Sequence, residues 1–170
     1  LPVAILGIGV GLLLLAVRRP TSSGDSMVEP IRALVSGPRG LRNNNPGNIV
    51  RTKDVWKGMS ADQSGDPRFV VFDAPVWGLR ALVRVLRQYM ARGATSVSAI
   101  ISRWAPTKET DTAAYIQAVS RAVGVSPTAA LAWDDAALRQ LVAAIVSHEN
   151  GKQPFDAGII QQAIQLERES

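Results

Sequence analysis

The sequence has no cysteine and only one histidine, His148, and these absences remove most of the chemistry open to a small enzyme. Without cysteine there is no disulfide, zinc-thiolate site or thiol nucleophile. One histidine cannot build the multi-histidine sites that hold catalytic metals. We therefore expect no metal and no cofactor, and we expect any bond cleavage to depend mainly on carboxyl groups.

Long apolar runs are also scarce, with one exception at the start of the chain. Residues 1–17 carry no charge, and Arg18 and Arg19 close the run. A membrane-spanning helix needs about 20 apolar residues, with a lower limit of roughly 17. A signal peptide would place its basic residues before the apolar run. The run therefore predicts an N-terminal transmembrane anchor over residues 1–19, although a helix buried against a partner would have the same composition.

The arginine pair after this run favours keeping the rest of the chain on the cytoplasmic side of a membrane. Residues 20–38 form a linker by composition, with a short helix predicted over Val28–Ser36. The length of the remainder suits a single domain, which we place at residues 39–170.

Positive charge is concentrated in the first half of that domain. Residues 39–103 contain eleven Arg and Lys against four Asp, whereas residues 106–170 contain five against eight Asp and Glu. A basic half suggests a polyanionic partner such as nucleic acid, anionic lipid or the bacterial cell wall. No helix-turn-helix motif is evident, which disfavours nucleic acid. Arg80, Arg84 and Arg87 would share one helix face, which is either solvated or in contact with an anionic polymer.

The stretch Arg42–Ile49 contains four asparagines, a proline and a glycine, a composition that excludes the interior of a helix or strand. It predicts a rigid polar loop whose amides pair with the hydroxyl and N-acetyl groups of a sugar chain. Trp56 follows closely and offers a flat apolar face to a sugar ring. The candidate substrate-binding residues here are Asn43, Asn44, Asn45, Asn48 and Trp56. The alternative is a turn that only reverses the chain.

The remaining pattern is mostly helical, so we expect a mainly α fold with a minor β element. Apolar residues recur at helical spacing in five segments. These predicted helices are Val76–Arg92, Val97–Trp104, Thr112–Val123, Asp134–His148 and a last one from Asp156 to about Glu167. The only predicted strand is Arg68–Asp73, which is short, aromatic and β-branched.

Glu149 follows the apolar stripe of the predicted helix that ends at His148. It lies four residues beyond Ile145 and seven beyond Val142, on the same helix face. Gly151 then ends the helix as a C-cap glycine would. Partial burial and the helix dipole would both raise the pKa of this carboxyl, as a general acid requires. The alternative is a frayed last turn that leaves Glu149 in water.

A second group of acids lies before the helix that begins at Thr112. Asp111 suits the N-cap position of that helix, whereas Glu109 has no capping role. Trp104 and Tyr115 flank these acids and could form the rim of a saccharide site. Cleavage of a glycosidic bond needs one protonated carboxyl and either a second carboxylate or a nucleophile from the sugar itself. We therefore name Glu149 as candidate acid, with Glu109 or Asp111 assisting.

The run from Arg39 to Ile49, with Trp104-Ala105-Pro106 and His148-Glu149-Asn150-Gly151 downstream, resembles a group of phage and prophage virion proteins. These are described as structural proteins or as lysozyme-like wall-degrading enzymes. The likeness covers roughly residues 39–160, and Asn44–Ile49 is its most specific part. The resemblance implies a lysozyme-like α+β domain, in a phage particle, that acts on peptidoglycan.

A weaker likeness connects the chain to glucosaminidases of the lysozyme superfamily. Those enzymes carry an Asn-Asn-Leu-Phe-Gly-Ile-Lys run followed by Trp-x-Gly, which Asn44–Ile49 and Trp56–Gly58 partly match. Their catalytic glutamate, in a Glu-Ser-Gly motif, precedes that run, whereas here Glu149-Asn150-Gly151 follows it. The resemblance therefore implies a circularly permuted arrangement with Glu149 in the place of the acid.

The leading hypothesis is a membrane-anchored virion enzyme, namely a muramidase, glucosaminidase or lytic transglycosylase, that opens the bacterial cell wall. Its expected partners are peptidoglycan, a membrane through residues 1–17, and other virion proteins. Its expected place is the membrane or interior of a phage particle, from which it acts in the bacterial envelope. The alternatives are a non-catalytic structural or membrane-penetration protein and an internal DNA-binding protein.

Overall fold

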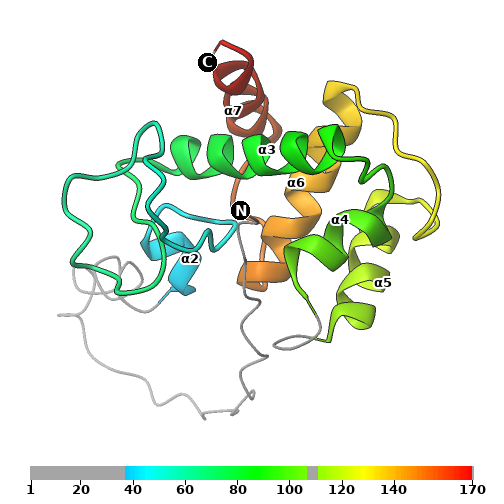
Figure 1. Ribbon diagram of the computed structural model, residues 1–170, viewed down its shortest axis with the longest axis horizontal. Helices are drawn as coiled ribbons and strands as arrows, with labels where there is room; N and C mark the ends of the chain where they lie inside the picture. The colour runs from blue at the N-terminus through cyan, green and yellow to red at the C-terminus, as the bar shows by residue number, and fades with distance from the viewer. Residues whose placement is uncertain (1–36, 107–110, 170) are drawn as a thin grey trace, which may run out of the picture.

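The computed structural model describes residues 37–106 and 111–169, and this part of the chain is mainly helical (Figure 1). It contains six helices and no regular strand. The helices are α2 (Arg39–Arg42), α3 (Pro75–Ala91), α4 (Val97–Trp104), α5 (Thr112–Val123), α6 (Asp135–Asn150) and α7 (Ala157–Arg168). Five of these agree with the helices expected from apolar spacing, to within two residues at each end.

Short polar side chains set the beginnings of four helices. Ser96, Asp111, Asp134 and Asp156 each accept a hydrogen bond from a backbone N–H in the first turn of the helix that follows. Helix α6 continues through Asn150, and Gly151 ends it with a φ of 67° in the left-handed region. The alternative of a frayed last turn is therefore wrong, and Glu149 lies inside the helix.

Helix α3 runs through the middle of the fold (Figure 1). It packs against α7 on one side, and α4 and α6 also contact it, while α5 packs against α4 and α6. The largest fully buried side chains come from these helices and from the segment before α3. They include Leu79, Leu82, Leu86, Ile100, Ile101, Trp104, Tyr115, Leu141, Ile49, Phe69 and Phe72.

The predicted strand Arg68–Asp73 is wrong as secondary structure, although its apolar residues are buried as expected. Phe69 and Phe72 each form an isolated antiparallel bridge, with Val50 and Met59 respectively. Between them the carbonyl oxygen of Val70 accepts a hydrogen bond from the Asn45 side chain, 2.9 Å from Nδ2. The backbone bonds of this segment are divided among Asn43, residues 49–51 and residues 58–60, so no continuous ladder with one partner forms.

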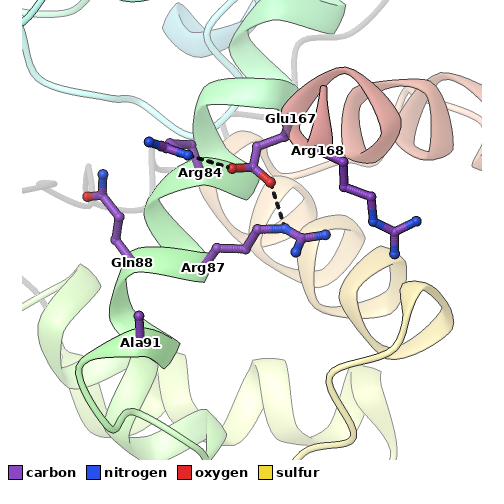
Figure 2. A pocket seen from close by; sticks show the side chains of 6 residues that line it. All are labelled: Arg84, Arg87, Gln88, Ala91, Glu167 and Arg168. Carbon is purple, nitrogen blue, oxygen red and sulfur yellow. Dashed lines mark hydrogen bonds and ion pairs between the residues drawn. The ribbon is translucent and has the colours of Figure 1, made fainter. Parts of the chain in front are cut away.

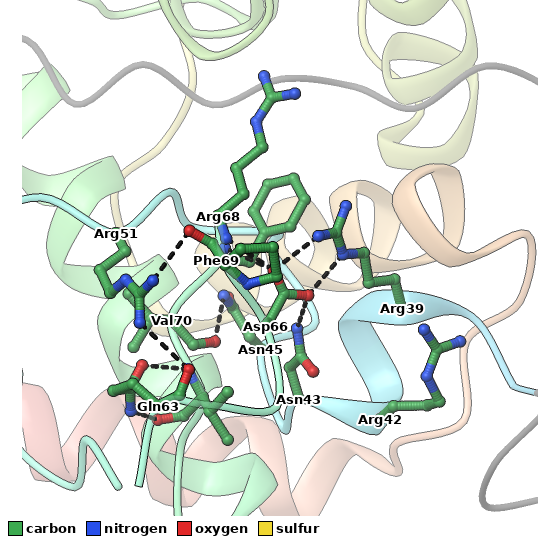
Figure 3. A network of polar contacts seen from close by, with 12 residues as sticks. Arg39, Arg42, Asn43, Asn45, Arg51, Gln63, Asp66, Arg68, Phe69 and Val70 are labelled. Atoms are coloured by element: carbon green, nitrogen blue, oxygen red, sulfur yellow. Dashed lines mark hydrogen bonds and ion pairs between the residues drawn. The ribbon is translucent and has the colours of Figure 1, made fainter. Parts of the chain in front are cut away.

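Asp66 organises the irregular segment before α3 (Figure 3). Its carboxylate accepts from both Nε and Nη2 of Arg39, from Nδ2 of Asn43, and from the backbone N–H groups of Arg68 and Phe69. Burial by itself would raise the pKa of Asp66, but these bonds to the carboxylate outweigh it and hold the pKa well below its usual value of 3.8. The buried carboxylate of Asp66 thus connects α2, the loop at Arg42–Ile49 (the asparagine loop) and the segment that leads into α3.

Three expectations fall on residues outside the described part of the chain: the anchor over residues 1–19, the helix Val28–Ser36 and the role of Glu109. None of the helices within residues 37–106 and 111–169 is both long enough and apolar enough to cross a membrane.

The arginines on one face of α3 contact helix α7 of the same chain. The sequence had suggested either a solvated face or contact with an anionic polymer. Arg80 donates to the carbonyl oxygen of Leu166, and Arg84 and Arg87 both pair with Glu167. These arginines therefore fasten α7 to α3, because guanidinium groups bind the last carbonyls and a carboxylate at the C-terminal end of that helix.

Candidate active site

Glu149 lies in the last turn of α6, and three hydrogen-bond donors converge on its carboxylate. Its Oε1 accepts from Tyr115 Oη at 2.8 Å and from Trp104 Nε1 at 3.1 Å. Its Oε2 accepts from Asn48 Nδ2 at 3.0 Å. Glu149 is half-buried, so solvent still reaches the residue. These partners come from three separate parts of the chain, which only folding brings together.

The asparagine loop reaches Glu149 because α6 binds the loop directly. Asn150 donates from Nδ2 to the carbonyl oxygen of Pro46 at 2.8 Å. Asn48 adopts a φ of 50°, a left-handed conformation that asparagine tolerates better than most residues. A Cβ atom on Gly47 would lie 3.3 Å from the Trp104 ring, so glycine allows the loop to pack closely on that indole. The loop and the end of α6 therefore position Asn48 jointly.

Trp104 and Tyr115 are buried residues that donate hydrogen bonds to the Glu149 carboxylate. Trp104 is the last residue of α4 and Tyr115 lies in the first turns of α5, and both are buried. The ring of His148 stacks on Tyr115, with 3.6 Å between centroids and 18° between planes. His148 is exposed, so this stack covers Tyr115 from the solvent side.

Burial raises the pKa of the Glu149 carboxyl above its usual value of 4.5. The hydrogen bonds from Asn48, Tyr115 and Trp104 favour the carboxylate and oppose this rise without cancelling it. Burial also raises the pKa of Tyr115 well above 10, and the nearby Glu149 adds to that rise. Burial lowers the pKa of His148 below 6.5. Tyr115 thus stays protonated as a donor, while Glu149 keeps its proton to a higher pH than an exposed glutamate does.

Three of the four loop asparagines point inward, whereas the sequence suggested amides facing a ligand. Asn45 has no exposed surface and donates to the carbonyl oxygens of Ile49 and Val70. Asn43 is buried and donates to Asp66, and half-buried Asn44 donates to the carbonyl oxygen of Phe72. This corrects the expectation of an outward-facing array, because buried amides are used where backbone groups lack regular partners.

Among the described residues, neither Asp111 nor Trp56 forms a hydrogen bond to the Glu149 carboxylate, and their surroundings differ from each other. Asp111 caps α5, with its Oδ1 accepting from the N–H of Ala114 at 3.0 Å. Trp56 is half-buried against the core, and its indole N–H has no hydrogen-bond partner among the described residues. Asp111 is therefore a structural cap, and Trp56 stays a candidate for a sugar contact.

Reasoning from sequence missed two residues of this site, His148 and Asn150. Both flank Glu149 directly in the sequence, and that adjacency was the only signal available. Their functions, stacking on Tyr115 and anchoring the loop, depend on residues more than thirty positions away.

Chemically, the site presents one carboxyl of raised pKa that is held by three neutral donors, in a residue that is half-buried. It can donate a proton to a bound group and then persist as a hydrogen-bonded carboxylate. Among the described residues no group of three or more His, Asp or Glu side chains is arranged to hold a metal ion. The arrangement fits acid catalysis by a single carboxyl.

Comparison with known proteins connects the chain to a phage protein. A search of protein-family models finds none that matches this chain. The chain is 40% identical over 121 residues to Protein P5 of Pseudoalteromonas phage PM2. The matched region is 69% of this chain and 74% of that phage protein.

Proposed function

We infer the function from one premise: this chain belongs to the same family as Protein P5 of Pseudoalteromonas phage PM2. We propose that it is a virion-associated enzyme that cleaves the glycan strands of bacterial peptidoglycan, with residues 1–17 as its membrane anchor. Its place of action is the bacterial envelope, which a phage must cross. The domain is proposed to be lysozyme-like and circularly permuted, with Glu149 as its acid.

The observation that carries this proposal is the environment of the Glu149 carboxyl. A general acid must hold its proton near the working pH and must be stable after giving it away. Burial favours the protonated form, and the three donors from Asn48, Trp104 and Tyr115 stabilise the carboxylate that remains. The residue is half-buried, and the proposal requires a substrate oxygen to reach its carboxyl group.

The proposed reaction begins when the Glu149 proton passes to the glycosidic oxygen while the bond from that oxygen to the anomeric carbon breaks. The leaving sugar departs with the proton as a hydroxyl group. Water or a hydroxyl of the same sugar then attacks the anomeric carbon and loses a proton to the Glu149 carboxylate, which restores the acid. Attack by water gives a reducing sugar, whereas attack by the internal hydroxyl gives an anhydro sugar. Glu109 is the candidate for a second carboxyl.

Substrate contacts are proposed at side chains that still have exposed surface. His148 lies next to the acid and is exposed, and Trp56 is half-buried. Asn48, Trp104 and Tyr115 are instead proposed to orient the acid, since their polar atoms contact its oxygens.

The test is a zymogram of the full chain in gels that contain peptidoglycan, comparing Glu149→Gln with wild type. Glu169→Gln, the same chemical change at the exposed C-terminal end of α7, is the matched control. We expect Glu149→Gln to lose at least about 100-fold in activity, the usual contribution of a general acid, and the control to retain it. Undiminished lysis by the Glu149 variant would reject the assignment. Mass spectrometry of the fragments then separates reducing from anhydro products.

One observation favours a second candidate, a non-catalytic virion structural or membrane-penetration protein. Both oxygens of Glu149 already have hydrogen-bond partners within the chain, as a purely structural carboxyl would. On this reading the wild-type chain would give no clearing band, and Glu149→Gln would change only its stability. Clearing by wild type that is lost in a folded Glu149→Gln protein excludes this candidate.

A further inference from the structure

An open cleft lies between α3 and the C-terminal end of α7, away from Glu149 (Figure 2). Its volume is about 470 Å³, and its lining is Arg84, Arg87, Gln88, Ala91, Glu167 and Arg168. In Figure 1 the end of α7 lies on one side of α3 and the end of α6 on the other. The cleft is therefore separate from the candidate active site.

Positive charge exceeds negative charge among the residues that line this cleft. Three arginines face one glutamate, and Glu167 is nearly inaccessible, with 4% of its side chain exposed. The side chains of Arg84 and Arg168 are about half exposed, at 47% and 52%. A ligand entering the cleft thus meets guanidinium groups before it meets the carboxylate.

The bonds to Glu167 fix two of these guanidinium groups and use only part of their donor capacity. Arg84 donates through Nη1 to Oε1 at 3.1 Å, and Arg87 contacts Oε2 through Nε at 2.7 Å. Each guanidinium carries five N–H donors. Arg168 is oriented in turn by an ion pair with Asp135 at the start of α6. The cleft therefore presents arginines that are already ordered, which reduces the entropy lost when a ligand binds.

We propose that this cleft binds a phosphate group carried on a larger molecule. Guanidinium groups recognise phosphate with paired N–H donors, and Gln88 adds an amide donor from the floor of α3. A phosphate offers more acceptor oxygens than a carboxylate, which suits a lining with several donors. The cleft is open, so the rest of the ligand extends into solvent.

The first test is a titration of the full chain with inorganic pyrophosphate at low ionic strength, followed by NMR of the arginine Nε–Hε signals. Arg84, Arg87 and Arg168 should shift together and reach saturation, and added salt should weaken the effect. Arg121 on α5 is exposed and serves as an internal control. Absence of saturation, or equal shifts at Arg121, would overturn the proposal.

Substitutions at Gln88 test the charge of the cleft while leaving the pairs with Glu167 in place. Gln88→Glu should weaken pyrophosphate binding by about 10-fold or more, and Gln88→Lys should strengthen it. Gln117→Glu and Gln117→Lys make the same changes on an exposed face of α5 and should alter binding by less than about 2-fold. If both Gln88 variants behave alike, or if the Gln117 pair matches them, the cleft is not the site.

Two further titrations identify the chemistry. Malonate, a dianion with carboxylates, should bind more weakly than pyrophosphate, and equal binding would reject the preference for phosphate.

Vesicles of phosphatidylcholine with phosphatidylglycerol are compared with vesicles of phosphatidylcholine alone. Binding that needs phosphatidylglycerol and is lost in Gln88→Glu assigns the phosphate to a lipid headgroup. Pyrophosphate binding without any preference for phosphatidylglycerol vesicles assigns it to a soluble or polymer-borne phosphate.

Discussion

Replacing Tyr115 by phenylalanine removes one of the three donors to Glu149 and leaves the packing almost unchanged. The Tyr115 hydroxyl lies 2.8 Å from Glu149 Oε1, which would keep its second donor, Trp104 Nε1, at 3.1 Å. Oε2 would keep Asn48. The phenylalanine ring can still stack on His148, so the substitution isolates a single hydrogen bond to a carboxylate.

The magnitude follows from the charge of the acceptor. A hydrogen bond to a charged group contributes about 1.5–3 kcal/mol, and a neutral one about 0.5–1.5 kcal/mol. Tyr115→Phe should therefore lower the free energy of unfolding by the larger amount when Glu149 is ionised and by the smaller amount when it is protonated. Because the lost bond favours the carboxylate, the variant should also raise the pKa of Glu149 further.

The direction of the pH dependence follows from linkage between proton binding and folding. The folded-state pKa of Glu149 is already above its usual value of 4.5, so stability is lost as pH rises from about 4.5 through the folded-state pKa. In Tyr115→Phe this loss should be larger and extend to higher pH. The stability difference between wild type and variant should therefore grow as pH rises through that window.

The assay is urea unfolding of both proteins at a series of pH values, with ¹³C NMR of the Glu149 carboxyl carbon to follow its pKa directly. Tyr89→Phe is the matched control. Tyr89 donates to the carbonyl oxygen of Arg103 at 3.3 Å, and burial raises its pKa to about 12, so it stays neutral throughout. NMR of the His148 ring separates its titration from that of Glu149. A Tyr115→Phe effect that is constant with pH, or that shrinks as pH rises, would refute the reasoning.

Three further predictions concern the scaffold around the site. Gly78→Ala should destabilise the protein by about 3 kcal/mol in thermal unfolding, because the new Cβ would lie 2.0 Å from the carbonyl oxygen of Asn44. Gly124→Ala meets no atom within 4 Å and should cost only about 1–2 kcal/mol for its φ of 76°; equal effects of the two would contradict this account. Asp66→Asn should cost roughly 2 kcal/mol near pH 7, since it weakens the bonds from Arg39. The stabilisation by the Asp66 carboxylate is present above pH 3.8 and is lost as pH falls through its lowered folded-state pKa, so a difference that grows in acid would argue against the network.

Several features of the fold were predictable because they depend on local sequence. The helices α3 to α7 follow from apolar spacing and from capping residues such as Asp134 and Gly124, which act within one turn of the chain. The absence of regular structure around Asn43–Asn48 follows from the backbone preferences of asparagine, glycine and proline. The placement of Glu149 on the apolar face of its helix is also a local property.

Local sequence was not enough to predict whether Arg68–Asp73 forms a strand. Its residues favour extended backbone and its phenylalanines are buried as expected. Whether a strand forms depends on a partner with matching backbone groups, and here the side chain of Asn45 and the isolated bridges take that place. The direction of the asparagine amides was equally undetermined, since a polar loop can face inward when buried backbone groups need partners.

The sequence by itself determined which residues form the helices α3 to α7, and it singled out Glu149 as a carboxyl drawn toward the core, because helical periodicity is a short-range property. Only the tertiary structure decided what surrounds that carboxyl. Asn48 lies 101 positions from Glu149, and Trp104 and Tyr115 lie 45 and 34 positions away. Such contacts depend on how helices pack, and packing is the sum of many weak interactions across the whole core, which no local pattern encodes.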